Sequence, residues 1–129
     1  MASIFTKIIN EEIPCFKIAE NDQFIAFLDI NPLMKGHCLV VPKVEVDYIF
    51  DLNDDLLKEM MTFSKMVASK IKSAIFCDRI GISVIGLEVP HAHIHLIPIN
   101  YMDDMNFSKP KLKLTSDQMK EIQQKILSV

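Results

Sequence analysis

The chain has 129 residues, a usual size for one domain, and 50% of them are hydrophobic. The formal net charge of -3, without a basic run, argues against nucleic acid as a partner. No apolar run approaches the ~20 residues of a membrane helix, and acidic residues near the start argue against a secretory signal. Three singly scattered cysteines fit reduced thiols. We therefore expect one cytoplasmic domain, residues 1–129, with neither nucleic acid nor membrane as a partner.

The first half of the chain predicts one short helix and three strands. "SIFTKIINEEIP" is typical of a helix that is capped by Ser3 and stopped before Pro14. "FKIAEN" and "QFIAFLDI" are apolar-rich runs that meet at Asn21-Asp22, which indicates a hairpin. "NPLMKGH" supplies a turn, and "HCLVVP" is a third strand that Pro42 ends.

The second half predicts a long helix, two strands and a final helix. "NDDLLKEMMTFSKMVASKIKSAI" begins with Asn53 as its N-cap. Its inward face is predicted from helical spacing to carry Leu56, Leu57, Met60, Met61, Ser64, Val67, Ala68, Ile71 and Ile75. "RIGISVIG" and "HAHIHLIPI" are the fourth and fifth strands, and in "TSDQMKEIQQKIL" Thr115 and Gln118 form a capping box. Hairpin strands with separate helices predict an α+β fold with a mostly antiparallel five-stranded sheet.

Three of the 4 histidines alternate along one predicted strand, in "PHAHIHLIP". Successive strand side chains point to opposite faces, so His91, His93 and His95 share one face, with ~6.6–7 Å between neighbours. We expect the other face to pack on the core, and it carries Ala92, Ile94 and Leu96. Chance does not readily place three imidazoles in register, so the row indicates a functional site.

Two kinds of chemistry fit such a row. Histidine is the commonest metal ligand, so His91 and His93 could hold one metal, completed by His37, Glu45 or Glu88. The third histidine of a straight strand lies too far away to join a ~2.0–2.1 Å zinc sphere. Alternatively, the central imidazole attacks an electrophile while its neighbours orient it and donate protons. We favour this second chemistry, which suits phosphoryl transfer, and predict no metal or other cofactor.

"HAHIHLIP" matches the motif His-φ-His-φ-His-φ-φ, with φ apolar. With "IFTKIINEEIP" and "FIAFLDINPLMKGHCLVVPK" upstream, the chain resembles the nucleoside-phosphoramidase-like and bacterial branches of the histidine triad (HIT) superfamily over most of residues 4–98. The resemblance implies a HIT-like α+β fold with a long helix and short terminal helices, and a homodimer. It also implies metal-free hydrolysis or transfer at the α-phosphate of nucleoside phosphoramidates or related purine nucleotides, through a nucleotidyl-histidine intermediate.

The same resemblance implies a role for each matching residue. His93 is similar to the nucleophile, His95 to a phosphate contact and proton donor, and His91 to the orienting histidine. His37 resembles the supporting imidazole, and Asp29 the acid that binds the ribose hydroxyls. An Asn31-Pro32 turn cap is an alternative role for that acid. The apolar slot around the base matches Ile4, Phe5, Ile8, Phe27 and Ile30, for which core packing is an alternative.

The segment before the triad departs from the family pattern. "ISVIGLEVPH" is short, with Leu87 in the glutamine position and Glu88 near the position of a small hydroxyl residue. Leucine donates no hydrogen bond, and a carboxylate repels phosphate oxygens unless it turns outward or pairs with Lys43. Glu45 stands where the family often has a further histidine. Two rivals therefore stay open: a nucleotide-binding module with little turnover, and a His-based metal-binding protein.

Overall fold

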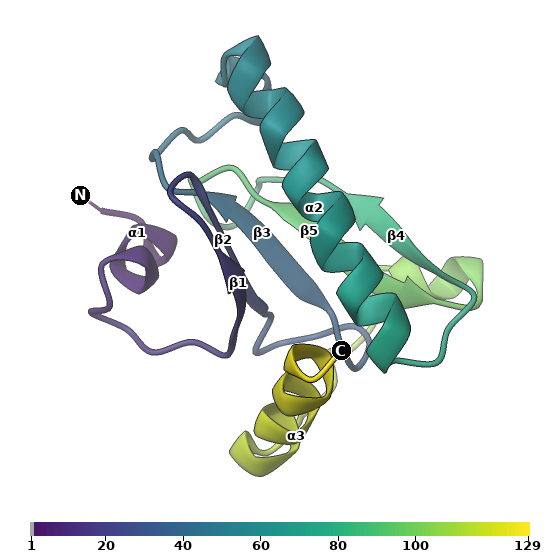
Figure 1. Ribbon diagram of the computed structural model, residues 1–129. Helices are drawn as coiled ribbons and strands as arrows, with labels where there is room; N and C mark the ends of the chain where they lie inside the picture. Colours follow the sequence, from purple (N-terminus) through teal and green to yellow (C-terminus); the bar gives the residue numbers. More distant parts are fainter. Residues whose placement is uncertain (1) are drawn as a thin grey trace.

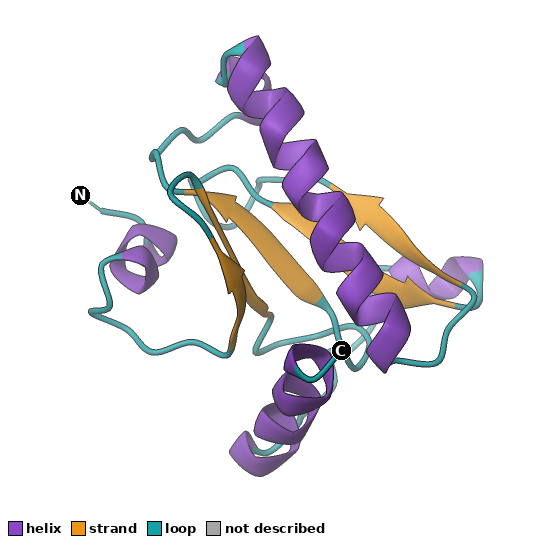
Figure 2. Cartoon of the chain, in the orientation of Figure 1, coloured by secondary structure: helices purple, strands orange, loops and turns teal. Residues whose placement is uncertain are grey.

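The computed structural model describes residues 2–129, which form one antiparallel sheet with helices packed against it (Figures 1 and 2). Its strands are β1 (Lys17–Glu20), β2 (Phe24–Leu28), β3 (Cys38–Pro42), β4 (Arg79–Ser83) and β5 (Ile94–Ile99). Its helices are α1 (Ile4–Ile9), α2 (Asp54–Ala74) and α3 (Ser116–Leu127), with short 3-10 helices η1 (Ile49–Asp51) and η2 (Met102–Met105). All four strand pairs are antiparallel, in the order β1-β2-β3-β5-β4, so the predicted α+β fold is confirmed.

The predicted caps begin the helices. Ser3 Oγ and Asn53 Oδ1 each accept a backbone N–H from the first helical turn, at 3.0 and 2.8 Å. At α3, Gln118 N–H donates to Thr115 Oγ1 at 3.1 Å, and Thr115 N–H donates to Gln118 Oε1 at 2.8 Å. These bonds satisfy backbone donors that have no partner inside the helix, which is why each helix starts at the expected residue.

Helix α2 crosses one face of the sheet and closes the main core (Figure 1). Its buried side chains are Met60, Phe63, Ser64, Val67 and Ile71. The expectation that Met61 faces inward is wrong: its side chain is 48% exposed, whereas Phe63 is 7% exposed. The inward stripe follows the spacing i, i+3, i+4, i+7, i+11 from Met60, which places Met61 outside it. Among residues 2–129, no helix combines the length and apolar character needed to cross a membrane.

Two boundaries differ from the expectation. Helix α1 ends at Ile9, well before Pro14, because Glu11 adopts a left-handed conformation (φ 63°) and Glu12 N–H donates to Lys7 O instead of continuing the helix. Strand β5 begins at Ile94, so the first two triad histidines precede it. The β3–β5 pairing stops at Val40–Ile94 because Pro42 has no N–H to offer and its carbonyl accepts a histidine ring instead.

Candidate active site

The predicted functional side chains lie on the sheet face opposite the main core. Alternation places every second residue of β2, β3 and the triad segment in the α2 core, Ala92, Ile94 and Leu96 among them, as expected. The intervening positions form the other face. It holds a smaller apolar cluster that includes Phe27 and Leu39, and the four histidines share its parity. All four imidazoles are buried, so each needs hydrogen-bond partners.

His91 is held at both ring nitrogens. Its Nε2 lies 2.8 Å from the carbonyl oxygen of Pro42, which can only accept, so Nε2 carries the proton. Its Nδ1 lies 2.7 Å from Ser3 Oγ and accepts from that hydroxyl. The ring is completely buried and has no free nitrogen. His91 can therefore orient other groups but cannot itself attack or ligate.

His93 presents an unprotonated nitrogen to solvent. Its Nδ1 lies 2.7 Å from the carbonyl oxygen of His91 and must be the donor, so in the neutral ring Nε2 carries the lone pair. Every fully buried side-chain nitrogen or oxygen in residues 2–129 has a partner, whereas this Nε2 has none and so must reach solvent. The ring as a whole is 6% exposed, and this burial lowers the pKa of His93. The neutral, nucleophilic form is favoured.

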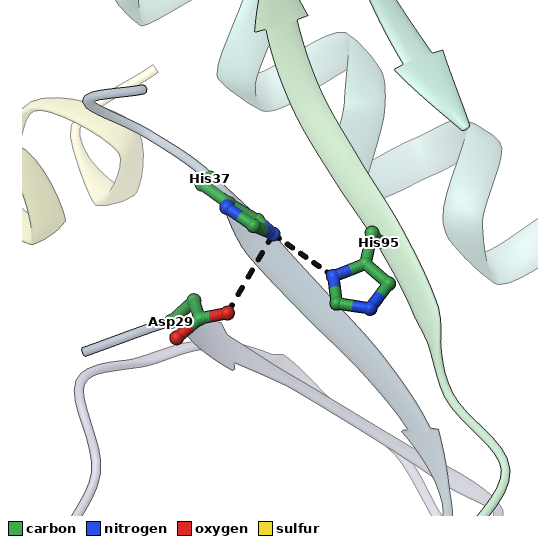
Figure 3. Close-up of side chains that lie close together, drawn as sticks. All are labelled: Asp29, His37 and His95. Atoms are coloured by element: carbon green, nitrogen blue, oxygen red, sulfur yellow. Dashed lines mark hydrogen bonds and ion pairs between the residues drawn. The ribbon is translucent and has the colours of Figure 1, made fainter. Parts of the chain in front are cut away.

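The ring of His37 is hydrogen-bonded to that of His95 (Figure 3), and this bond gives His95 the tautomer opposite to that of His93. The backbone N–H of Leu33 donates to His37 Nδ1 at 3.0 Å, so the proton of neutral His37 is on Nε2. That Nε2 lies 3.0 Å from His95 Nδ1 and donates to it, which leaves the His95 proton on its own Nε2. This Nε2–H also reaches solvent, and its ring is 4.9 Å from that of His93. Two adjacent rings thus carry an unprotonated Nε2, in His93, and an Nε2–H donor, in His95.

Burial keeps both His37 and His95 neutral. Desolvation, followed by the charge of the neighbouring imidazole, lowers the pKa of His37 to about 3. Desolvation and the adjacent His93 lower the pKa of His95 to about 4. Both rings are therefore uncharged near pH 7, and each carries a single proton.

Asp29 lies beside His37 and serves partly as a turn cap (Figure 3). Its Oδ1 accepts the backbone N–H of Asn31 at 2.8 Å, as the turn-cap alternative predicted. Its Oδ2 is 3.6 Å from His37 Nε2, too long for a hydrogen bond, and burial raises the pKa of this carboxyl. One carboxylate oxygen therefore stays free beside the imidazoles.

A metal fits neither group of candidate ligands. Ligand atoms of Asp29, His37 and His95 lie within 4.8 Å of one another. A cation there would need a lone pair on His37 Nε2 while Nδ1 still accepts from Leu33, and that state is an imidazolate. The pair expected in the metal alternative, His91 and His93, lacks a free nitrogen on its first member. The donors form a hydrogen-bonded chain instead.

The residues expected around a base are only partly brought together. Phe5 lies edge-on to the Phe27 ring at 5.6 Å and to the His93 ring at 4.9 Å. Ile8 packs against the same cluster. Ile4 and Ile30 are 48% and 66% exposed and lie outside it, so their part in binding a base stays a prediction.

The structure also shows where the residues that depart from the family pattern lie. Leu87 and Glu88 are exposed, and Lys43 pairs with Glu20 at 2.9 Å rather than with Glu88. The Glu88 charge still raises the pKa values of Asp29 and His93, as a secondary effect in each, so it lies near the site. The side chain of Glu45 bonds residues at the start of α1, Ser3 and Thr6.

Two residues near the site were missed by the sequence analysis, Phe107 and Lys111. The Phe107 ring lies 4.9 Å from the His95 ring, and Lys111 Nζ lies 5.8 Å from the Phe107 ring centre. Leu112 N–H donates to Pro32 O at 2.8 Å, which anchors their segment beside the β2–β3 turn. Their segment follows neither helical nor strand periodicity, so only a long-range contact reveals their place.

The sequence and the fold are similar to those of known proteins. A family model described as HIT domain matches residues 10–102. An "Uncharacterized HIT-like protein" of Borreliella burgdorferi is 35% identical, over 95% of this chain and 94% of its own. An "Adenosine 5'-monophosphoramidase" of Schizosaccharomyces pombe is 32% identical, over 99% of this chain and 98% of its own. A crystal structure of a "Hit-like protein" from Bartonella henselae superposes with a TM-score of 0.84 at 28% identity, over 98% and 95% of the two chains. The chain therefore belongs to the HIT family.

Proposed function

We propose that this chain, as a single HIT-like domain, is a nucleotide hydrolase or transferase that acts on nucleoside phosphoramidates or related purine nucleotides. His93 is the nucleophile, and a nucleotidyl-histidine is the intermediate. One observation carries the proposal: His93 and His95 alone among the four histidines have a free Nε2, and the two nitrogens have opposite protonation. The monophosphoramidase name of the Schizosaccharomyces pombe relative supports the substrate class.

The reaction proceeds in two displacements. The lone pair of His93 Nε2 attacks the α-phosphorus, and the bond from phosphorus to the leaving nitrogen breaks with its electrons. The leaving nitrogen takes a proton from water. The His93 ring becomes cationic, and the carbonyl of His91, 2.7 Å from Nδ1, stabilises that charge. Water then attacks phosphorus, the bond to Nε2 breaks, and the attacking water gives its proton to solvent, so that a nucleoside monophosphate leaves and the ring is neutral again.

His95 binds the phosphate in this scheme. Its neutral Nε2–H donates to a non-bridging oxygen, where negative charge concentrates in the transition state. Of its two expected roles, this contact is the better supported. Since the pKa of His95 is lowered to about 4, loss of the Nε2 proton near pH 7 would leave an imidazolate. His37 holds the ring in the donor tautomer.

The nucleoside is placed on the remaining candidates. Asp29 offers its free Oδ2 to the ribose hydroxyls while Oδ1 holds the turn. The base contacts the apolar residues next to the nucleophile, with the exposed ones at the rim, and these are Phe5, Ile8, Phe27, Ile4 and Ile30. The contact of Phe5 with both Phe27 and His93 supports this placement, because it joins the apolar cluster directly to the reacting nitrogen.

Trapping the intermediate tests the proposal. The protein is mixed with adenosine 5′-phosphoramidate labelled at phosphorus, quenched in alkali, and digested so that the labelled peptide can be identified. We expect label on the peptide that contains His93, and none on the His93→Ala variant. Label on another residue, or turnover by His93→Ala, would contradict the mechanism.

A nucleotide-binding module is the second candidate, favoured by one observation. The Glu88 carboxylate influences both Asp29 and His93, so it adds negative potential where an anionic substrate must enter. Tight nucleotide binding by the wild type, with neither label nor turnover, would favour this module. In that case Glu88→Gln should bind nucleotide more tightly.

We also propose that the chain forms a homodimer. Strand β4 is an outer strand of the sheet, and Ile82, Val84 and Ile85 on or just after it are exposed. Exposed apolar side chains at a sheet edge favour association with a second edge. Sedimentation equilibrium should give twice the chain mass for the wild type and the single mass for Val84→Lys. A wild type that stays monomeric at micromolar concentration would contradict this proposal.

A further inference from the structure

We propose that Glu45, acting through Ser3 and Thr6 of the α1 start, positions the nucleophile by fixing the ring and carbonyl of His91. The three residues lie far from the triad in the sequence and touch no reacting atom in the proposed mechanism. Their role as positioning residues rests on the proposed function only in so far as His93 is the nucleophile.

The hydrogen bonds of this group have one consistent assignment. Glu45 Oε1 accepts the backbone N–H of Ser3 at 2.6 Å and the hydroxyl proton of Thr6 at 2.7 Å. With its only hydroxyl proton on the carboxylate, Thr6 has none for His91 Nδ1, which lies 3.4 Å away. Ser3 Oγ accepts the Thr6 N–H at 3.0 Å. Its own proton has two possible acceptors, Thr6 Oγ1 at 3.3 Å and His91 Nδ1 at 2.7 Å. It goes to the ring nitrogen, because that contact is shorter and Nδ1 of neutral His91 has no proton of its own when Nε2 donates to Pro42 O.

This assignment reaches the nucleophile through the backbone. With Nδ1 accepting from Ser3, His91 must carry its proton on Nε2, which donates to Pro42 O at 2.8 Å. The peptide around His91 is also fixed, because its N–H donates to Val89 O at 2.8 Å and the next N–H donates to Val46 O at 2.7 Å. The carbonyl of His91 therefore points at His93 Nδ1 at 2.7 Å and leaves the lone pair on Nε2.

The carboxylate also holds α1 in place. The helix has only six residues, too few to be stable alone, and its serine cap bonds His91 as well as the helix. Between Ser3 and Thr6 lies Phe5, whose ring is 4.9 Å from the His93 ring and 5.9 Å from the His91 ring. The bonds from the Ser3 backbone N–H and from Thr6 lower the pKa of Glu45 to about 2, so the acceptor remains charged at every pH of interest.

Three variants test the network, each with a matched control. Ser3→Ala removes the donor to His91, and Ser3→Thr keeps a hydroxyl. Thr6→Val removes the hydroxyl that donates to Glu45 while keeping nearly the same side-chain shape, and Thr6→Ser keeps that hydroxyl. Glu45→Gln removes the charge. Glu20→Gln is its control, because Glu20 is also an exposed carboxylate that bridges two groups, Lys17 and Lys43, and its bonds do not involve α1.

The decisive readout is the nitrogen-15 chemical shift of the His91 and His93 rings, which reports where each proton lies. We expect mixed tautomers in Ser3→Ala and Glu45→Gln, and wild-type shifts in Ser3→Thr and Glu20→Gln. The kcat for adenosine phosphoramidate should fall about 10- to 100-fold in the first two variants, as for a misplaced reacting group.

Unchanged ring shifts in folded Ser3→Ala and Glu45→Gln would overturn the proposal, and so would a fall in kcat without a change in shift. Should loss of the cap unfold Ser3→Ala, Glu45→Gln still decides the question, because it keeps the Ser3 cap. Thr6→Val, which removes one of the two bonds to the carboxylate, should shift the tautomers less than Glu45→Gln, and Thr6→Ser should not shift them. The shifts need no turnover, so the positioning role can fail while the labelling of His93 succeeds, and the reverse.

Discussion

The two faces of the sheet are built from the same strands but bury different kinds of side chain. The α2 face buries aliphatic and aromatic side chains, and its buried hydroxyl, that of Ser64, bonds a carbonyl of its own helix at 2.8 Å. The other face buries four imidazoles, each with hydrogen-bond partners, beneath the six-residue helix α1 and the segment that carries Phe107. The first face is closed by apolar packing, and the second by a smaller apolar cluster together with hydrogen bonds to the imidazoles.

Because of this difference, adjacent residues have different roles: one packs in the core and the next lies in the candidate active site. His93 and Ile94, or His95 and Leu96, are neighbours in sequence yet contact different clusters. Removing apolar volume from the α2 face should cost stability, because the cavity cannot refill. Removing the imidazole of His93 from the other face should cost activity rather than stability, because its free Nε2 reaches solvent and bonds no other group of the protein. Paired substitutions of neighbouring residues in the triad segment can therefore separate effects on folding from effects on catalysis.

The largest expected effect is on turnover. His93→Ala should lower kcat/KM for adenosine phosphoramidate by roughly 10³-fold or more, because no other free lone pair lies at that place. Its thermal unfolding should stay close to that of the wild type. Ile94→Val is the neighbouring control: it should cost about 1 kcal/mol of stability and leave kcat unchanged. Equal activity losses in the two variants would contradict the division between the faces.

The largest effect on stability should come from Leu96→Ala. This side chain is fully buried in the α2 core, so its truncation should lower the free energy of unfolding by about 2–5 kcal/mol. Urea denaturation measures the loss, and kcat per folded molecule should be unaffected. Leu127→Ala, at the exposed end of α3, should lose less than about 1 kcal/mol. If Leu96→Ala abolished kcat while remaining folded, the two faces would be coupled rather than separate.

The buried histidines should make stability depend on pH. Their ordinary pKa is 6.5, whereas the pKa values of folded His37 and His95 are lowered to about 3 and about 4. Below pH 6.5 the unfolded chain thus binds more protons, and the free energy of unfolding falls as the pH falls. Each group contributes a slope of about 1.4 kcal/mol per pH unit in that window.

His37→Asn sharpens this prediction, since asparagine can still accept the Leu33 N–H but does not titrate. Its stability should fall less steeply than that of the wild type between pH 6.5 and pH 5. Measurement should stop there because the pKa of Asp29 is raised above its usual 3.8, and this contributes the opposite slope at lower pH. Parallel stability curves for the two proteins would contradict the burial of a neutral His37.

Local pattern was enough to predict most of the fold. Caps such as Asn53 and Thr115 act within one helical turn, and strand alternation has a period of two, so both are visible in short stretches of sequence. The histidine face follows from the same period. Met61 was misplaced because several phases of an apolar helix fit nearly the same stripe, and only contact with the sheet selects one.

The rest of the site depends on contacts between distant segments. Glu45 meets Ser3 and Thr6 across about forty residues of sequence, and no spacing rule joins them. Proton positions on the four rings depend on backbone groups, such as the Leu33 N–H and the Pro42 carbonyl, that a sequence does not orient. Motif and resemblance could therefore name the histidines and imply a role for each, while the position of the proton on each ring required coordinates.

The smallest expected effect concerns Lys111, a cation that the sequence pattern did not reveal. Its ammonium donates to Phe107 O at 2.6 Å and to Lys109 O at 3.4 Å, and within residues 2–129 it forms no ion pair. Its charge adds to the lowering of the pKa values of His37 and His95 and offsets part of the rise in the pKa of Asp29, so it should attract an anionic substrate. We expect Lys111→Met to raise KM by about 3- to 10-fold, the effect of about 1 kcal/mol, with kcat nearly constant.

Lys113→Met, two residues along in the same segment, is the control and should leave KM unchanged. The KM effect of Lys111→Met should also shrink as salt is added, because a charge acting through solvent is screened. If kcat fell instead, Lys111 would act on the transition state, and the segment after η2 would belong to the catalytic face rather than to its approach. If both lysine variants behaved alike, the effect would be one of general surface charge.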